Sequence, residues 1–197
     1  LLEVETEDGS ARLRFDMTVQ ADGVEHSLVK ATIEAGPSRS VTAPTTAALE
    51  SHAPASFELP VRFWAPDLDW TIHLDRGADG TSLLISSELH NPTDQPIRLG
   101  ECRLVSIAGD RGEAVVAGDD GNAVYLHVSG TTGPTRVHRA DEAEDSFSRI
   151  LLQFVSHAAG RALHLGFVPF THQHTIHRFD YGENGFASLE CVCDFQD

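Results

Sequence analysis

The 197-residue sequence predicts an all-β fold, a two-layer antiparallel β-sandwich with little or no helix. Apolar and polar residues alternate with period two along most of the chain, which is typical of strands with one buried and one solvated face. Turn dipeptides that contain Gly, Asn or Asp separate these runs, and no segment has the period of a convincing amphipathic helix. Hairpins stacked in two layers would bury the apolar faces of all these strands.

The expected strands follow one another along the whole chain. Residues 11–19 alternate most regularly, with apolar residues at the odd-numbered positions and polar residues at the even-numbered ones. Further alternating runs cover residues 57–64, 70–74, 83–89, 97–107, 124–128, 163–170, 175–181 and 186–195. Residues 150–155 form the most apolar stretch, which predicts a central strand. Pro60 predicts an edge position or a bulge, because proline cannot donate a hydrogen bond to a neighbouring strand.

Hairpin turns are expected at Asp-Gly and Asn-Gly dipeptides, because both residues tolerate positive φ. These dipeptides are Asp8-Gly9, Asp22-Gly23, Asp79-Gly80, Asp120-Gly121 and Asn184-Gly185. The two prolines of residues 91–96 predict a rigid turn between two strands. Residues 140–147 are the best candidate for one short helical turn, although their acidic run also suits a solvated loop.

We expect one domain rather than two. Residues 1–34 supply N-terminal strands of the same sandwich, because alone they would bury too little apolar area to be stable. Residues 35–56 are rich in Ala, Pro, Ser and Thr, which predicts a long loop or linker. Residues 57–197 form the main β-sandwich.

The acidic composition restricts the partners of this chain. Acidic residues outnumber basic ones by 30 to 14, for a formal net charge of −16. This charge repels phosphate backbones and anionic lipids, so neither nucleic acid nor a membrane is an expected partner. No apolar run approaches the roughly 20 residues of a membrane-spanning helix. The balance favours a neutral or cationic ligand, and no motif indicates a cofactor.

The three cysteines are Cys102, Cys191 and Cys193, and their spacing does not indicate a disulfide framework. We expect reduced thiols that lie partly in the core, which favours the cytoplasm or another reducing compartment. No signal peptide is visible. The chain starts at Leu1 rather than Met, as expected if a native N-terminus has been removed.

A weak metal site is suggested by two pairs of residues with the same spacing. His172 and His174 point to one side of an extended chain, as do Cys191 and Cys193. If the two segments were paired strands, these four side chains could converge on zinc. The alternative is that the histidines, of which the chain has 11, line a loop or a half-exposed strand.

A candidate carbohydrate site lies around two tryptophans. Trp64 and Trp70 flank a short segment that contains Asp67 and Asp69. Aromatic rings against the C–H faces of a sugar, with carboxylates bonded to its hydroxyls, are a usual arrangement for carbohydrate binding. The alternative is that at least one of the two tryptophans belongs to the core.

No catalytic motif is found in the sequence. It contains neither a G-x-S-x-G nucleophile elbow nor a phosphate-binding glycine loop. Carboxylates in or near strands, such as Glu101 and Asp194, do not stand out as a pair suited to glycoside hydrolysis. We therefore assign no catalytic residue.

Four segments of the chain resemble a known family. They are H-N-P-T-D-Q-P-I-R-L-G (90–100), F-S-R-I-L-L (147–152), G-R-A-L-H-L-G-F (160–167) and F-A-S-L-E-C-V-C-D-F (186–195). Over residues 70–195 the chain resembles the N-terminal β-supersandwich, a galactose-mutarotase-like fold, of melibiase-type alpha-galactosidases and related glycoside hydrolases. In that family the sandwich packs on a (β/α)8 barrel, which holds the aspartate nucleophile and the aspartate acid/base.

The resemblance implies a non-catalytic N-terminal accessory domain of an alpha-galactosidase-like glycoside hydrolase. The partners that it implies are the catalytic barrel of the same parent protein, expected after Asp197, carbohydrate, and further copies in a homo-oligomer. One alternative is a free-standing carbohydrate-binding module or lectin. Another is an enzyme similar to aldose mutarotases, in which His127, His164 or His174 would act with a carboxylate as acid and base.

Overall fold

The computed structural model describes the chain in segments, almost all of which are β-strands. The described residues are 1–5, 11–28, 32–34, 40–41, 47–49, 56–64, 67–76, 82–108, 112–116, 124–128, 136–139, 147–149, 151–156, 160–168, 174–182 and 185–195. They contain no α-helix, and all but one of their strand pairings are antiparallel. The predicted all-β fold is confirmed.

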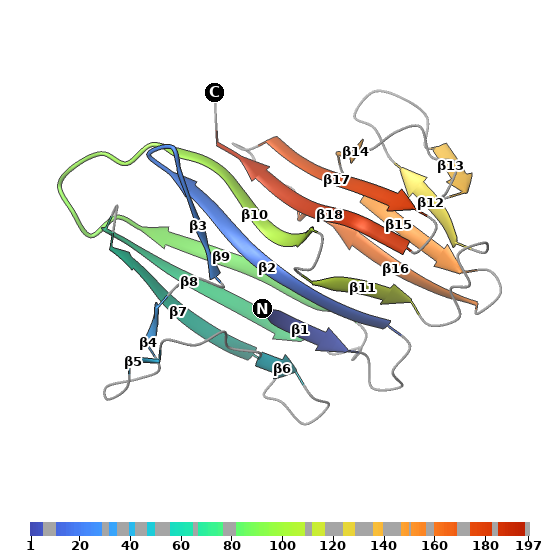
Figure 1. The fold of residues 1–197 in the computed structure, drawn as a ribbon, viewed down its shortest axis with the longest axis horizontal. Coiled ribbons are helices and arrows are strands. Elements are labelled where there is room, and N and C mark those ends of the chain that lie inside the picture. The colour runs from blue at the N-terminus through green and yellow to red at the C-terminus, as the bar shows by residue number, and fades with distance from the viewer. Residues whose placement is uncertain are drawn as a thin grey trace.

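The largest sheet has nine strands and forms the front layer in Figure 1. Its main order is β14-β17-β18-β10-β2-β1-β6, and both β3 and β11 also pair with β2. The bounds are β1 (Leu2–Glu5), β2 (Ala11–Ala21), β3 (Val24–Ser27), β6 (Ala47–Leu49), β10 (Leu99–Ala108), β11 (Glu113–Val116), β14 (Phe147–Ser148), β17 (His174–Gly182) and β18 (Gly185–Asp194). The parallel pair is β1 with β6.

Two smaller sheets lie side by side behind the large one (Figure 1). The five-stranded sheet has the order β5-β4-β7-β8-β9, with β4 (Thr32–Glu34), β5 (Ser40–Val41), β7 (Ser56–Trp64), β8 (Asp67–Arg76) and β9 (Leu83–His90). The four-stranded sheet has the order β13-β12-β15-β16, with β12 (Val124–Val128), β13 (Arg136–Arg139), β15 (Leu151–Ser156) and β16 (Arg161–Gly166). The apolar run at 150–155 is thus an interior strand, as predicted.

One core of apolar side chains joins the three sheets. Its fully buried members include Phe15 and Met17 of β2, Trp70 and Ile72 of β8, and Leu152 and Phe154 of β15. The ring of Phe154 lies edge-on to that of Phe179 on β17, at 6.4 Å between centroids. The ring of His26 on β3 lies 4.7 Å from that of Phe63 on β7. Each smaller sheet therefore packs on the inner face of the nine-stranded sheet.

The β2–β3 hairpin turns at Asp22-Gly23, as the sequence predicts. Both residues have positive φ, 50° at Asp22 and 78° at Gly23, and Ala21 pairs directly with Val24. The Asp22 N–H donates to the carbonyl of Arg98 at 2.8 Å, and the Arg98 N–H donates to Asp22 Oδ1 at 2.9 Å. These two bonds tie the turn to the chain just before β10.

The described segments also bear on the expected loop and turns. β1, β2 and β3 share the nine-stranded sheet with the C-terminal strands β17 and β18. Within residues 35–56, where composition predicts a loop, the structure describes the short strands β5 and β6. Of residues 140–147 only Phe147 is described, and it begins β14. The dipeptides at 8–9, 79–80 and 120–121 lie outside the described residues.

A histidine of β17 is enclosed in the core. His177 is 1% exposed, its Nδ1 lies 3.3 Å from the carbonyl oxygen of Ser148, and its ring lies 4.6 Å from that of Phe167. Burial disfavours the imidazolium form and lowers the pKa of His177 to about 4, although the bond to Ser148 opposes this shift. The side chain is therefore neutral in the folded protein at pH 7.

We expect the free energy of unfolding to fall by about 2 kcal/mol through His177 between pH 7.5 and pH 5. In the unfolded chain His177 binds a proton in this range, because its pKa is the ordinary 6.5. In the folded chain it binds a proton only near pH 4. Stability is therefore lost as the pH falls from 6.5 towards 4. Urea unfolding of wild type and His177→Gln at both pH values measures the effect. An equal pH dependence in the two proteins would contradict the prediction.

Among the residues that the structure describes, no helix is long and apolar enough to cross a membrane.

Candidate functional site

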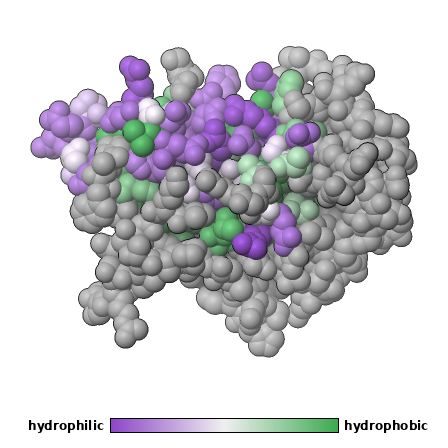
Figure 2. All heavy atoms as spheres, viewed as in Figure 1, coloured by the Kyte–Doolittle hydropathy of each residue, from purple (hydrophilic) through white to green (hydrophobic). Residues whose placement is uncertain are grey.

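The outward face of the nine-stranded sheet carries polar and apolar side chains in aligned rows. The register places Phe147, Arg178, Glu190, Ser106 and Asp16 side by side across β14, β17, β18, β10 and β2. Directly opposed residues of antiparallel strands share a face, so these five belong to one row. Figure 2 shows hydrophilic residues gathered over this sheet.

A second row runs beside the first. It consists of Ile176, Val192, Arg103, Thr18 and Ser27, on β17, β18, β10, β2 and β3. Val192 is completely buried although it lies on the outward face, and Thr18 and Ser27 are also buried. Thr18 accepts a hydrogen bond from Arg103, and Ser27 donates one to Asp16, so both buried hydroxyls are paired with charged neighbours on this face.

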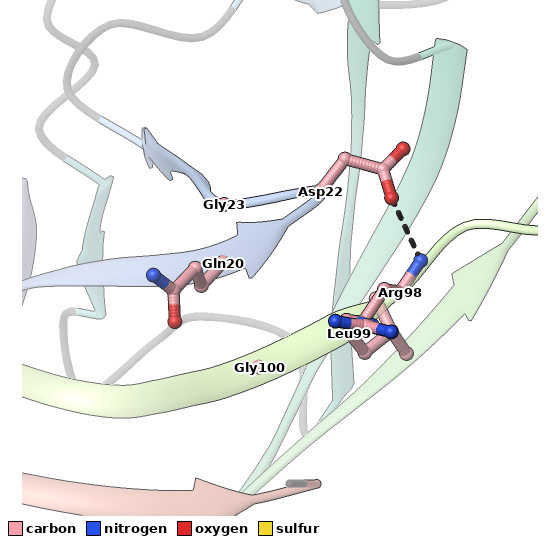
Figure 3. Close-up of a pocket in the computed structure, with 6 residues that line it drawn as sticks. All are labelled: Gln20, Asp22, Gly23, Arg98, Leu99 and Gly100. Carbon is pink, nitrogen blue, oxygen red and sulfur yellow. Dashed lines mark hydrogen bonds between the residues drawn. The ribbon is translucent and has the colours of Figure 1, made fainter.

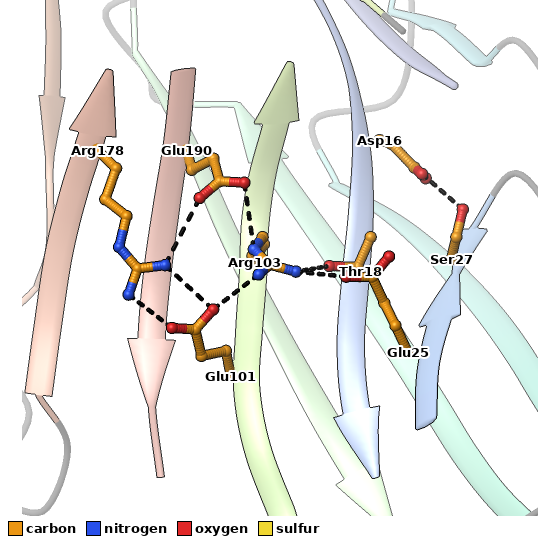
Figure 4. A network of polar contacts seen from close by, with 8 residues as sticks. All are labelled: Asp16, Thr18, Glu25, Ser27, Glu101, Arg103, Arg178 and Glu190. Atoms are coloured by element: carbon orange, nitrogen blue, oxygen red, sulfur yellow. Dashed lines mark hydrogen bonds and ion pairs between the residues drawn. The ribbon is translucent and has the colours of Figure 1, made fainter. Parts of the chain in front are cut away.

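A network of ion pairs crosses the two rows (Figure 4). Arg178 donates two hydrogen bonds to Glu101, at 2.6 Å from Nη2 and 3.1 Å from Nη1. Arg103 donates to the same carboxylate at 2.8 Å and to Glu25 at 2.6 Å. Glu190 lies between the two guanidinium groups, 3.3 Å from Nε of Arg103 and 3.7 Å from Nη1 of Arg178. Four strands are thereby joined by charge-assisted contacts.

The network fixes the protonation of its central carboxylate. The hydrogen bond from Arg178 is the main cause that lowers the pKa of Glu101, and it raises the pKa of Arg178 in turn. Burial opposes both shifts. Glu101 therefore stays ionised at neutral pH, a state that stabilises the ion pairs and cannot supply a proton to a substrate.

We expect Glu101→Gln to lower the free energy of unfolding by about 1 to 2 kcal/mol. The amide keeps the shape but removes the negative charge that two guanidinium groups share. The side chain of Glu101 is 20% exposed, so the expected loss lies between that of a fully exposed ion pair and that of a fully buried one. Glu88→Gln on the exposed side of β9 is the control, with an expected change within about 0.5 kcal/mol. Chemical denaturation of both variants measures the difference. Equal values for the two variants would contradict the prediction.

A pocket of about 410 Å³ opens beside the network. Its lining residues are Phe147, Ile176, Arg178, Phe179, Ser188 and Glu190. Phe147 is 45% exposed and pairs directly with Arg178, which pairs directly with Glu190. An exposed aromatic ring thus stands next to a hydrogen-bond donor, a carboxylate and a hydroxyl.

A second pocket, of about 550 Å³, lies at the turn between β2 and β3 (Figure 3). It is lined by Gln20, Asp22, Gly23, Arg98, Leu99 and Gly100. The carboxylate of Asp22 already accepts the N–H of Arg98, which fixes the turn. None of the described residues that line this pocket is aromatic, and its acidic group, Asp22, already has a structural role in the turn.

The structure contradicts the sugar-binding role predicted for Trp70. Trp70 is completely buried in the core, beside Phe63 at 5.9 Å between ring centroids. Asp67 and Asp69 are partly exposed on β8, on the opposite side of the strand from Trp70. Trp64 ends β7, but its side chain is not among those that the structure describes. The alternation of Trp70 with Ile72 and Leu74 was the sequence signal that indicated a core position.

The predicted metal ligands do not converge. β17 and β18 do pair, but His174 lies opposite Asp194 and Thr175 lies opposite Cys193, so His174 and the two cysteines Cys191 and Cys193 occupy different faces. His172 lies outside the described residues. Within the described part of the chain, no group of three His, Cys, Asp or Glu residues could hold a metal ion.

All three cysteines are free and buried on the inner face. Burial raises the pKa of Cys102 and of Cys191 to about 12, and that of Cys193 to about 11. Because the thiolate is the reactive form, these side chains behave as packed apolar groups. The expectation of reduced core cysteines agrees with this placement.

The histidines considered for mutarotase-like chemistry are dispersed. His164 is exposed on β16 of the four-stranded sheet, where its Nε2 lies 3.4 Å from Nε2 of Gln153. His174 is exposed on β17 of the nine-stranded sheet. The side chain of His127 is not among those described. The two described histidines therefore belong to different sheets.

Comparisons with protein-family models, with curated proteins and with solved structures found no match to this chain.

Proposed function

We propose that this chain is a non-catalytic accessory domain of an alpha-galactosidase-like glycoside hydrolase and supports a separate catalytic (β/α)8 barrel. The observation that carries the proposal is the arginine-paired carboxylate network on the outward face of the nine-stranded sheet. Glycoside hydrolysis needs one carboxyl group that holds a proton at working pH and another that faces the sugar. Glu101, held ionised between Arg103 and Arg178, cannot be the group that holds the proton, and both of its oxygens already accept hydrogen bonds from these two arginines.

The same face suits a structural role. A sheet face with mutually paired charges offers hydrogen-bonding groups to a second protein surface without a large cost for isolated charge. The segments that resemble melibiase-type enzymes supply the identity of the proposed partner, a barrel that follows residue 197 in the parent protein. Three free cysteines support a reducing compartment, so we also propose a cytoplasmic location.

Activity assays test the non-catalytic role. We expect the 197-residue chain to release no product from aryl α-galactosides or aryl β-galactosides. Hydrolysis by the chain that a single Asp or Glu substitution abolishes would overturn the proposal. The coding sequence downstream of residue 197 tests the partner: a region that encodes no barrel would contradict the accessory role.

A further inference from the structure

We infer that the pocket at Phe147, Arg178, Ser188 and Glu190 is a binding site for a neutral saccharide. This inference goes beyond the accessory role and does not depend on it, because it stands on the pocket alone. The pocket lies at the β14 edge of the nine-stranded sheet, next to the ion-pair network.

The apolar wall of the pocket suits the face of a sugar ring. Phe147 exposes 45% of its surface, and the partly buried Ile176 lines the same pocket. Sugar rings have C–H groups on one face, and an exposed aromatic ring removes these groups from water. Within the described segments, four large apolar side chains are exposed, and of these Phe147 alone lines this pocket.

The polar wall offers both donors and acceptors. The guanidinium of Arg178 has more N–H groups than the two that donate to Glu101, and the ion pairs of Glu190 lie at 3.3 and 3.7 Å. The hydroxyl of Ser188 can donate and accept. Sugar hydroxyls also donate and accept, so this set matches adjacent hydroxyl groups of one ring.

The charges of the wall favour a neutral ligand. Arg178 lies between Glu101 and Glu190, so a phosphate or sulfate that approached the arginine would also meet two carboxylates. An amine that approached Glu190 would meet Arg178 and Arg103. A neutral polyol avoids both repulsions and keeps its hydrogen bonds. The volume of about 410 Å³ falls within the range of roughly 300 to 1,000 Å³ of small-molecule sites and can hold one or two sugar rings.

Titration of the 197-residue chain with galactose, glucose, mannose and their common disaccharides tests the inference. We expect calorimetry or ligand-observed NMR to detect binding of at least one of these sugars. We expect Phe147→Ala to weaken that binding about tenfold, because it removes the apolar wall. Val168→Ala is the matched control: Val168 is 58% exposed and does not line the pocket, so its loss should leave the affinity unchanged.

Two further arms test the site and the ligand class. Ser188→Ala should also weaken binding, with an unchanged unfolding midpoint that separates it from a folding defect. The 6-phosphate and the amino derivative of the sugar that binds should each bind more weakly than that sugar itself. Absence of binding by every neutral sugar, equal affinity in Phe147→Ala and wild type, or stronger binding of a charged analogue would each overturn the inference. Hydrolysis of an aryl galactoside would instead contradict the non-catalytic proposal and leave the binding result intact.

Discussion

Trp70→Ala is expected to lower the free energy of unfolding by about 3 to 5 kcal/mol. The side chain has no exposed surface and is among the largest fully buried groups of the core. Its ring lies 5.9 Å from that of Phe63, and Ile72 and Leu74 lie buried on the same side of β8. Truncation removes the apolar contacts of a whole indole and leaves a cavity between the five-stranded and nine-stranded sheets.

Urea unfolding of Trp70→Ala and Trp70→Phe measures this effect. The phenylalanine variant keeps an aromatic ring and should lose less stability, because no partner of the indole Nε1 is found among the described residues. A loss below about 1 kcal/mol in Trp70→Ala would place the side chain outside the core. A weakened sugar affinity in a variant of unchanged stability would restore the carbohydrate role first predicted for this residue.

Gly112→Ala is expected to lower the free energy of unfolding by more than about 2 kcal/mol. Gly112 precedes β11 with φ of +98°, and a Cβ there would collide with the carbonyl oxygen of Arg14 on β2. β2 cannot easily move aside, because Arg14 pairs with Glu3 of β1 as well as with Glu113 of β11. The substitution combines a disfavoured backbone conformation with a steric clash.

Gly23→Ala is the matched control for Gly112→Ala. Gly23 has φ of +78°, but a Cβ there would meet no atom within 4 Å. Its cost is therefore the conformational one alone, about 1 to 2 kcal/mol. The difference between the two variants in thermal or chemical unfolding isolates the clash with Arg14. Equal losses would show that β11 can shift away from β2.

Local features of the sequence predicted much of the fold. The alternation of residues 11–19 gave β2 with its correct buried face, since Phe15, Met17 and Val19 are all buried. The Asp22-Gly23 dipeptide gave the first hairpin, because its need for positive φ is a property of two adjacent residues. Such signals require no knowledge of which strands pair.

Pairing between distant strands could not be predicted, and the candidate site depends on it. Alternation alone puts Glu101 and Arg103 on one face of their strand, but nothing local indicates that Arg178 lies beside Glu101. The metal prediction was wrong for the same reason, because the register of two strands could not be predicted. The two strands do pair, but their register puts His174 on one face of the sheet and Cys191 and Cys193 on the other. A shift of one residue in register would have reversed this result.

β2 pairs both with strands that are close to it in sequence and with strands that are far from it in sequence. β1 and β3 are its neighbours in sequence, but Arg103 of β10 donates to Thr18 from 85 residues further along the chain. During synthesis, one edge of β2 therefore stays unpaired until β10 and β11 have left the ribosome. Contacts of such long sequence separation slow folding. The emerging N-terminal strands would meanwhile present an unpaired edge, so expression of this protein should respond strongly to chaperone supply and to growth temperature.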